Sequence, residues 1–321
     1  MIGWFDSTAR RSGCIVAVAI LALTTAQASL AEVITAGRPV IAREPGRIVS
    51  IGGAVTEILY ALGMERHIVA IDTTSLYPPR APAEKPNVGY MRQLSPEGVL
   101  GLSPTLLLAI EGAGPKETMA VLEAARVPLV LIPDRYSGEG ILEKIRTVAR
   151  AAGVSERGEC LAAMVQTDLD ALTVIRTRID KPARVLFVLS FLNGRAMVAG
   201  RKTAADGIIR LAGGVNAIAE YEGYKPINDE ALVAAKPDAV LVMQRGSESL
   251  TAETVFAHPG FALTPAAANK SFVSMEGLYL LGFGPRTALA ARDLAHALYP
   301  GPGREALPSE RAGAVAETCR P

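Results

Sequence analysis

Short apolar segments alternate with helical patterns along most of this chain, and that alternation limits its possible folds more than any other feature. Strands are predicted at Arg47–Ile51, Ile68–Ile71, Leu106–Ile110 and Val127–Ile132. Helical patterns lie between them, at Val55–Leu62, Pro96–Leu102 and Lys116–Ala125. Strands that alternate with helices in this way form an α/β layer around a mainly parallel sheet.

The pattern becomes helical from Gly138 to Ile179 and then returns to strand at Arg184–Leu189. Ser155 can cap a helix running from about Glu156, which at ~1.5 Å per residue is about 36 Å long and has no strand partner. A helix of that kind can separate two domains. We therefore predict two Rossmann-like α/β lobes with mainly parallel sheets, at residues 32–155 and 181–321, joined by a long α-helix at residues 156–180.

The second half of the chain repeats a piece of the first half. The segment Pro96–Leu108 aligns without gaps on Asp229–Leu241, and each reads as a short amphipathic helix, a proline turn and a buried strand. Glu97 aligns with Glu230. Units of this kind are common in α/β proteins, but together with the helical spacer the match favours two similar lobes. Ligands of open α/β sheets bind beyond the carboxyl ends of the strands, which predicts a shared cleft.

The first 31 residues have the pattern of a secretory signal peptide. Arg10 and Arg11 precede an apolar run from Cys14 to Leu23, and small residues at 26–31 supply two candidate cleavage sites. An uncleaved membrane anchor is the alternative, but the run has about half of the ~20 residues that a spanning helix needs. Cys14 starts the apolar run, which is the wrong place for a lipid-modified cysteine. We expect an exported, soluble mature chain.

Composition and motifs argue against several functions. The net charge of +1 predicts no nucleic-acid partner. The chain has no Gly-x-Ser-x-Gly, no Walker loop and no paired histidines, and Gly282–Arg286 lacks the third glycine of a dinucleotide site. We therefore predict that the protein is not an enzyme.

The cysteines and histidines do not form a metal-binding pattern. Cys160 and Cys319 remain after removal of the signal peptide, and two cysteines can pair in an oxidising compartment. The sequence leaves their proximity open. The three histidines, His67, His258 and His296, lack ligand spacing.

Five motifs resemble the periplasmic haemin-binding proteins of bacterial haem ABC importers, over nearly the whole mature chain. They are Val88–Leu94, Pro96–Gly98, Thr203–Asp206, Gly223–Pro226 and Gly282–Arg286. The two-lobed, helix-linked architecture is shared with the wider group of vitamin B12 and siderophore binding proteins, whereas Val-Gly-Tyr-x-Arg resembles the haem branch. The resemblance implies a periplasmic protein that binds ferric haem in the inter-lobe cleft, with a corrinoid or a ferric siderophore as the alternative ligand.

The resemblance implies that Tyr90 coordinates the haem iron through its phenolate oxygen. Fe(III) and phenolate are a hard cation and a hard donor. A free phenol has a pKa near ~10, and a nearby guanidinium favours its anion. Arg92 would share a face with Tyr90 if this piece is extended. Packing of the Tyr90 ring at the lobe edge is the alternative role.

Other residues are candidates for the remaining contacts of the ligand. Family members with a second axial ligand use a histidine from the second lobe, and no histidine lies between His67 and His258. We therefore expect five-coordinate haem. The propionates need cations or hydroxyls, for which the candidates in order are Arg245, Tyr279 and Arg286, followed by Tyr224 and Lys225.

Glu97 and Glu230 are candidates for partner docking. In the wider family, one glutamate at the tip of each lobe docks onto arginines of the permease, and the internal match places these two glutamates in register. The resemblance thus implies a monomer that works with the membrane permease and ATPase of an ABC importer. An exported haem store or sensor is the alternative outside transport, and an enzyme on the same scaffold is a further one.

Overall fold

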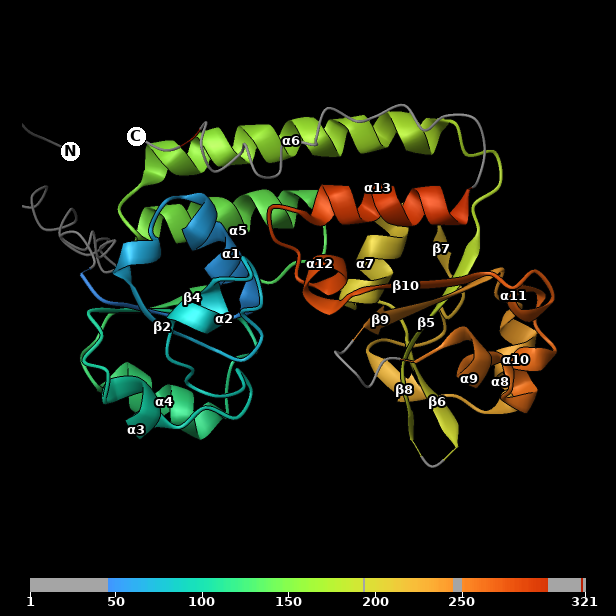
Figure 1. The fold of residues 1–321 in the computed structure, drawn as a ribbon, viewed down its shortest axis with the longest axis horizontal. Helices are drawn as coiled ribbons and strands as arrows, with labels where there is room; N and C mark the ends of the chain where they lie inside the picture. The colour runs from blue at the N-terminus through green and yellow to red at the C-terminus, as the bar shows by residue number, and fades with distance from the viewer. Residues whose placement is uncertain (1–45, 193, 245–249, 300–318, 320–321) are drawn as a thin grey trace, which may run out of the picture. The chain divides into compact units, whose positions relative to one another are not determined.

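The computed structural model describes residues 46–192, 194–244, 250–299 and 319 (Figure 1). The predicted signal peptide at residues 1–31 and the candidate Arg245 lie outside these described residues. Within them, no helix combines the length and the apolar character that crossing a bilayer requires.

The first sheet contains four parallel strands, as the alternating pattern predicts. They are β1 (Ile48–Ile51), β2 (Ile68–Ile71), β3 (Leu106–Ile110) and β4 (Leu129–Ile132), in the order β2-β1-β3-β4. Ile48 pairs with Leu106, and β1 and β3 are buried along their whole length. Continuous burial explains why these strands read as apolar runs without polar alternation.

Helices cover both faces of this sheet. They are α1 (Gly53–Ala61), the 3-10 helix η1 (Glu65–His67), α2 (Ala81–Glu84), α3 (Pro96–Leu100) and α4 (Lys116–Ala124). Val99 of α3 and Met119 of α4 pack with Val49 and Leu107 on one face. On the opposite face α1 packs against α5 (Gly138–Ala151). The predicted helices therefore form, within a residue or two of the expected bounds.

The long helix expected at 156–180 is α6, which spans Ser155–Thr177. It packs along α5 and along α13 (Thr287–Leu298), the last helix of the described residues, as Figure 1 shows. Because α13 follows the second sheet in the chain, α6 contacts helices that belong to both sheets. The lobe boundaries at 155 and 181 remain a prediction.

The second sheet is mixed, although most of its strand pairs are parallel, as expected for this lobe. Its strands are β5 (Arg184–Leu192), β6 (Arg195–Ala199), β7 (Val215–Asn216), β8 (Tyr224–Pro226), β9 (Ala239–Gln244) and β10 (Phe272–Glu276). The order is β10-β9-β5-β6-β8, with β7 beside β5. Strands β10, β9, β5 and β7 are parallel, whereas β6 is antiparallel to β5 and β8. Only two residues join β5 to β6, and a connection that short permits only an antiparallel pair.

The second sheet carries the remaining helices. They are α7 (Ala204–Leu211), α8 (Asp229–Ala235), α9 (Ala252–Phe256), α10 (Pro259–Ala262), α11 (Pro265–Ala268), α12 (Gly277–Leu281) and α13. Helices α12 and α7 pack against α13. Thr203 caps α7, with its hydroxyl accepting a hydrogen bond from the Asp206 amide at 3.1 Å.

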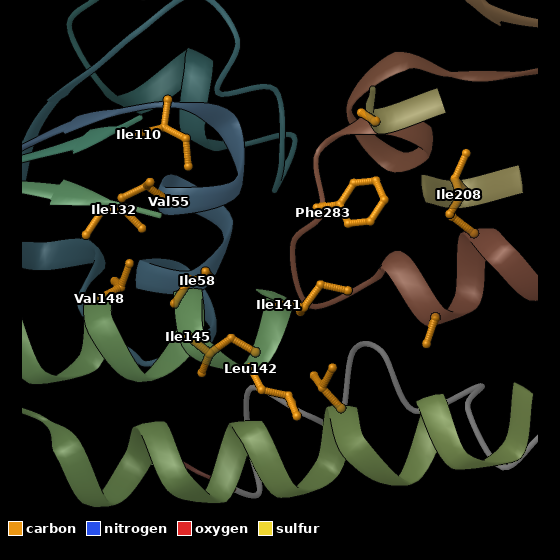
Figure 2. Packing of buried hydrophobic residues seen from close by; sticks show 14 of the residues in the cluster. Val55, Ile58, Ile110, Ile132, Ile141, Leu142, Ile145, Val148, Ile208 and Phe283 are labelled. Atoms are coloured by element: carbon orange, nitrogen blue, oxygen red, sulfur yellow. The ribbon is translucent and has the colours of Figure 1, made fainter. Parts of the chain in front are cut away.

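One hydrophobic cluster joins the helices of both sheets. In Figure 2, Ile145 of α5 lies beside Ile58 of α1, and Ile141 of α5 lies on the side toward Phe283, which precedes α13; all four are fully buried. Continuous packing of this kind holds the helices of the two sheets together through α5 and α6.

The internal repeat seen in the sequence is also present in the structure. Helix α3 with β3 corresponds to α8 with β9, and Glu97 and Glu230 are each the second residue of their helix. The residues before the two aligned prolines, Ser103 and Lys236, have φ of 49° and 44°. Left-handed backbone is uncommon for residues other than glycine, so its occurrence at aligned positions supports a true structural repeat.

Cys160 and Cys319 form a disulfide, with their Cα atoms 5.7 Å apart. The sequence had left this pairing open. Cys160 belongs to α6, so the bridge fastens residue 319 to the long helix. The sequence separation of 159 residues explains why spacing alone did not reveal it.

Candidate ligand cavity

A cavity of about 1640 Å³ lies at the carboxyl ends of strands from both sheets. Gly52 follows β1, Thr73 lies just beyond β2, and Ile110 ends β3. From the second sheet, Gln244 ends β9 and Glu276 ends β10. This is the position that an open α/β sheet offers to a ligand, and the cavity is large enough for a bulky one.

Five of the eight tyrosines of the chain line this cavity. They are Tyr77, Tyr90, Tyr136, Tyr224 and Tyr279. Aromatic residues make up only 5% of the sequence, so their convergence here is a property of the site. Apolar side chains such as Met91, Met243 and Leu281 share the wall. A wall of this composition suits a large ligand with flat apolar surfaces.

Tyr90 lies in a loop that is fastened at both ends. The Thr73 amide donates to the Gly89 carbonyl at 3.0 Å, and the Gly114 amide donates to the Met91 carbonyl at 2.9 Å. Gly89 has φ of +95°, a conformation that favours glycine and turns the chain just before the tyrosine. Tyr90 is 41% exposed, and it lines the cavity together with Arg92. The structure thus places both predicted residues at one site.

A charged pair connects the cavity wall to helix α5, because Asp134 lines the cavity and binds Lys144. Lys144 of α5 has a fully buried side chain, and its Nζ lies 2.7 Å from Oδ1 of Asp134. The Tyr136 hydroxyl donates to the other Asp134 oxygen at 3.1 Å. Burial and the adjacent Asp134 carboxylate raise the pKa of Tyr136 far above its usual range. Tyr136 therefore stays a neutral phenol with its proton directed at Asp134.

Arg286, a residue of the cavity wall, has a buried partner that the sequence did not indicate, Glu57 of α1. The Arg286 Nε and Nη2 atoms donate to the two Glu57 carboxylate oxygens, each at 3.0 Å. The Glu57 side chain is 5% exposed and that of Arg286 is 17% exposed. Burial lowers the pKa of Arg286, but the hydrogen bond and charge of Glu57 outweigh this and raise it. The guanidinium is thus permanently charged and held by an α1 carboxylate.

Tyr279 is also held by carboxylates. Its hydroxyl donates to Asp293 Oδ2 at 2.8 Å, and its backbone amide donates to Glu276 at 2.7 Å. Burial and the hydrogen bond to Asp293 raise the pKa of Tyr279 far above its usual range. The ring therefore faces the cavity with its hydroxyl already engaged.

The remaining candidate residues from the sequence do not all lie on the cavity wall. Tyr224 lines the cavity, whereas Lys225 places its Nζ 5.0 Å from the Tyr221 ring centroid and is not part of the wall. Glu97 and Glu230 are exposed and lie outside the cavity wall. The described wall includes no histidine, and no three His, Cys, Asp or Glu side chains gather into a metal-binding group among the described residues.

Sequence reasoning missed several wall and support residues. Asp134 and Tyr136 follow β4, so the rule that ligands bind at the carboxyl ends of strands could have identified them. Glu57 lies within a buried helix and Lys144 on a helix face. Neither position has a local signal that separates it from an ordinary helical charge.

Comparison with known proteins places the chain in a family. The family described as periplasmic binding protein matches residues 48–277, well over half of the chain. The periplasmic heme-binding protein RhuT from Roseiflexus sp. RS-1, in its apo form, is 43% identical with a TM-score of 0.76, over 80% of this chain and 98% of that one. The periplasmic heme-binding protein BhuT, in complex with two hemes, is 40% identical with a TM-score of 0.74, over 78% and 97%.

A third relative has a different ligand in its name. The vitamin B12-binding protein of Pectobacterium carotovorum subsp. carotovorum (strain PC1) is 24% identical over 261 residues, which are 80% of this chain and 91% of that protein. The chain belongs to the periplasmic binding protein family, in the superfamily of two-lobed proteins that bind vitamin B12, siderophores and haem. Members of this family bind a substrate for transport and are not enzymes.

Proposed function

We propose that this protein binds ferric haem in the cavity and delivers it to the permease and ATPase of an ABC importer. One observation carries the choice of ligand, which is the position of Tyr90 on the wall of a large, tyrosine-rich cavity. The haem-binding proteins to which the chain is 40% and 43% identical support this choice. In this proposal the protein is exported to the periplasm and works as a monomer.

Tyr90 is the proposed ligand of the iron because two other tyrosines of the cavity wall have hydroxyls that already form hydrogen bonds with the protein. The hydroxyls of Tyr136 and Tyr279 donate to carboxylates, and their raised pKa values oppose formation of a phenolate. No hydrogen bond holds the Tyr90 hydroxyl within the described residues. Arg92, on the same wall, supplies a positive charge that favours a phenolate or meets an anionic group of the ligand.

The transport role rests on the two exposed glutamates. Glu97 and Glu230 occupy the second position of α3 and α8, which are aligned units of the internal repeat. Two equivalent carboxylates, one beside each sheet, suit a pair of equivalent arginine sites on a two-subunit permease. Arg245, outside the described residues, stays a candidate for the propionates.

Titration of the purified mature protein with haemin tests the proposed ligand. We expect tight binding and a high-spin ferric spectrum with a phenolate charge-transfer band. Tyr90→Phe should abolish the band and weaken binding. Tyr221→Phe is a matched control, because Tyr221 lies outside the cavity wall. Absence of binding at micromolar haemin, or a band that survives in Tyr90→Phe, would contradict the proposal.

A corrinoid is the second candidate ligand, and the vitamin B12-binding relatives favour it. Cyanocobalamin needs no phenolate from the protein, because it brings its own axial ligands to the cobalt, whereas haemin leaves an axial position of the iron open to a protein ligand. Titration with cyanocobalamin therefore separates the two ligands. Binding of cyanocobalamin that is unaffected by Tyr90→Phe, together with weak binding of haemin, would favour the corrinoid.

A further inference from the structure

Arg286 has its hydrogen-bonding fork occupied before any ligand enters. The Nε and Nη2 atoms and the backbone amide of Arg286 all donate to the Glu57 carboxylate, at 3.0, 3.0 and 3.2 Å. This fork-to-carboxylate geometry is the one in which a guanidinium binds a carboxylate most strongly. A second carboxylate, brought by a ligand, would have to compete with a buried one already in place.

Two aromatic rings lie close to the same guanidinium. Arg286 Cζ lies 3.5 Å from the centroid of the Tyr77 ring and 5.2 Å from that of the Tyr279 ring. Tyr77 comes from the loop after β2, whereas Tyr279 belongs to α12. A cation within about 6 Å of a ring centroid attracts the ring, so Arg286 holds both rings.

Both rings are part of the cavity wall, and one of them has an anchor of its own. Tyr77 and Tyr279 both line the cavity, and both rings lie near Arg286. The Tyr279 hydroxyl is fixed on Asp293. For Tyr77 no anchoring hydrogen bond is found within the described residues, so the stacking on Arg286 is the contact that orients it.

We propose that Arg286 is a positioning residue, fixed by Glu57, that sets Tyr77 and Tyr279 as aromatic walls against the flat face of a conjugated macrocycle. It therefore does not serve as the cation that meets the carboxylates of the ligand. This inference rests on the proposed haem-binding function and replaces the role in propionate binding expected for Arg286 from the sequence.

Haemin and its dimethyl ester separate the two roles, because they share the macrocycle and the iron and differ in the carboxylates. Arg286→Lys keeps the charge and loses the fork and the flat face. We expect Arg286→Lys and Glu57→Gln each to weaken haemin and its ester by the same factor, about tenfold. Glu159→Gln is the matched control, since it removes a carboxylate from the surface pair with Arg146 and should change neither affinity.

A third variant tests the aromatic wall without disturbing the buried ion pair, so that a loss of affinity need not reflect a loss of folding. Tyr77→Leu leaves the buried ion pair in place and removes one ring, and we expect it to weaken both ligands to a similar extent. A loss confined to haemin in Arg286→Lys would show direct carboxylate contact and overturn the inference. Unchanged affinities in Tyr77→Leu would overturn it as well. If the wild-type protein binds neither porphyrin, the proposed function fails, and this inference fails with it.

Discussion

Lys144 Nζ lies 2.7 Å from Asp134 Oδ1, and the lysine side chain is fully buried while the aspartate side chain is 22% exposed. Removal of one member of a buried pair leaves an uncompensated charge, which typically costs about 3–5 kcal/mol. We expect Asp134→Asn to approach that loss, because it leaves the fully buried charge of Lys144 without a partner. Lys144→Met should cost less, since Asp134 retains partial access to water and its hydrogen bond from Tyr136.

Urea unfolding of the two single variants and the double variant measures this asymmetry. The double variant should be more stable than Asp134→Asn, because it leaves no unpaired buried charge. Equal, small losses in the two single variants would show that the pair is effectively solvated.

Under the proposed docking role, Glu97 and Glu230 should affect transport without affecting ligand binding. We expect Glu97→Ala combined with Glu230→Ala to abolish haem uptake in cells that depend on this importer, while haemin affinity and stability stay unchanged. Both side chains are exposed, so folding does not depend on them.

Glu117→Ala combined with Glu253→Ala is the control for that experiment. These residues are exposed glutamates in the first turns of α4 and α9, beside the same two sheets. Full uptake with the Glu97 and Glu230 double variant would argue for a haem store or sensor instead of a transport component.

Alkaline pH should destabilise the fold through its buried phenols. The pKa values of Tyr136 and Tyr279 are raised by burial and by neighbouring carboxylates. Below ~10, the pKa of a phenol in the unfolded chain, both states are neutral and stability does not depend on these groups. Above it the unfolded chain loses these protons first, so the free energy of unfolding falls as pH rises.

Urea unfolding between about pH 8 and about pH 11 tests that dependence. The fall should be shallower in Tyr279→Phe than in the wild type, because one of the groups responsible has been removed. An identical slope in the two proteins would mean that Tyr279 titrates alike in the folded and unfolded states.

The disulfide between Cys160 and Cys319 should contribute measurably to stability. Loss of a native disulfide typically costs about 2–5 kcal/mol, and the cross-link here spans a separation of 159 residues. We expect the double variant Cys160→Ala, Cys319→Ala to unfold at lower urea concentration and to keep its affinity for haemin. Thiol titration of the denatured mature protein should find no free cysteine, and two free thiols per chain would contradict the pairing.

Local patterns were sufficient to predict the α/β class, the strands of the first sheet and the long helix. The apolar runs at β1 and β3 and the helical period of α6 depend on neighbours a few residues apart, and all three elements formed close to their expected bounds. The proline-turn repeat also gave the matching positions of Glu97 and Glu230. The hairpin of β5 and β6 was not predicted, and it is the reason that the second sheet is mixed.

The sequence by itself determined the α/β alternation, the long helix and the repeat, and it marked Tyr90 and Arg92 as candidates, because periodicity and short motifs are properties of adjacent residues. Only the tertiary structure decided what surrounds them. Glu57 meets Arg286 at a separation of 229 residues, and the five cavity tyrosines come from separate loops and elements. Contacts of that kind depend on how the two sheets and their helices pack, and no spacing along the chain records that packing.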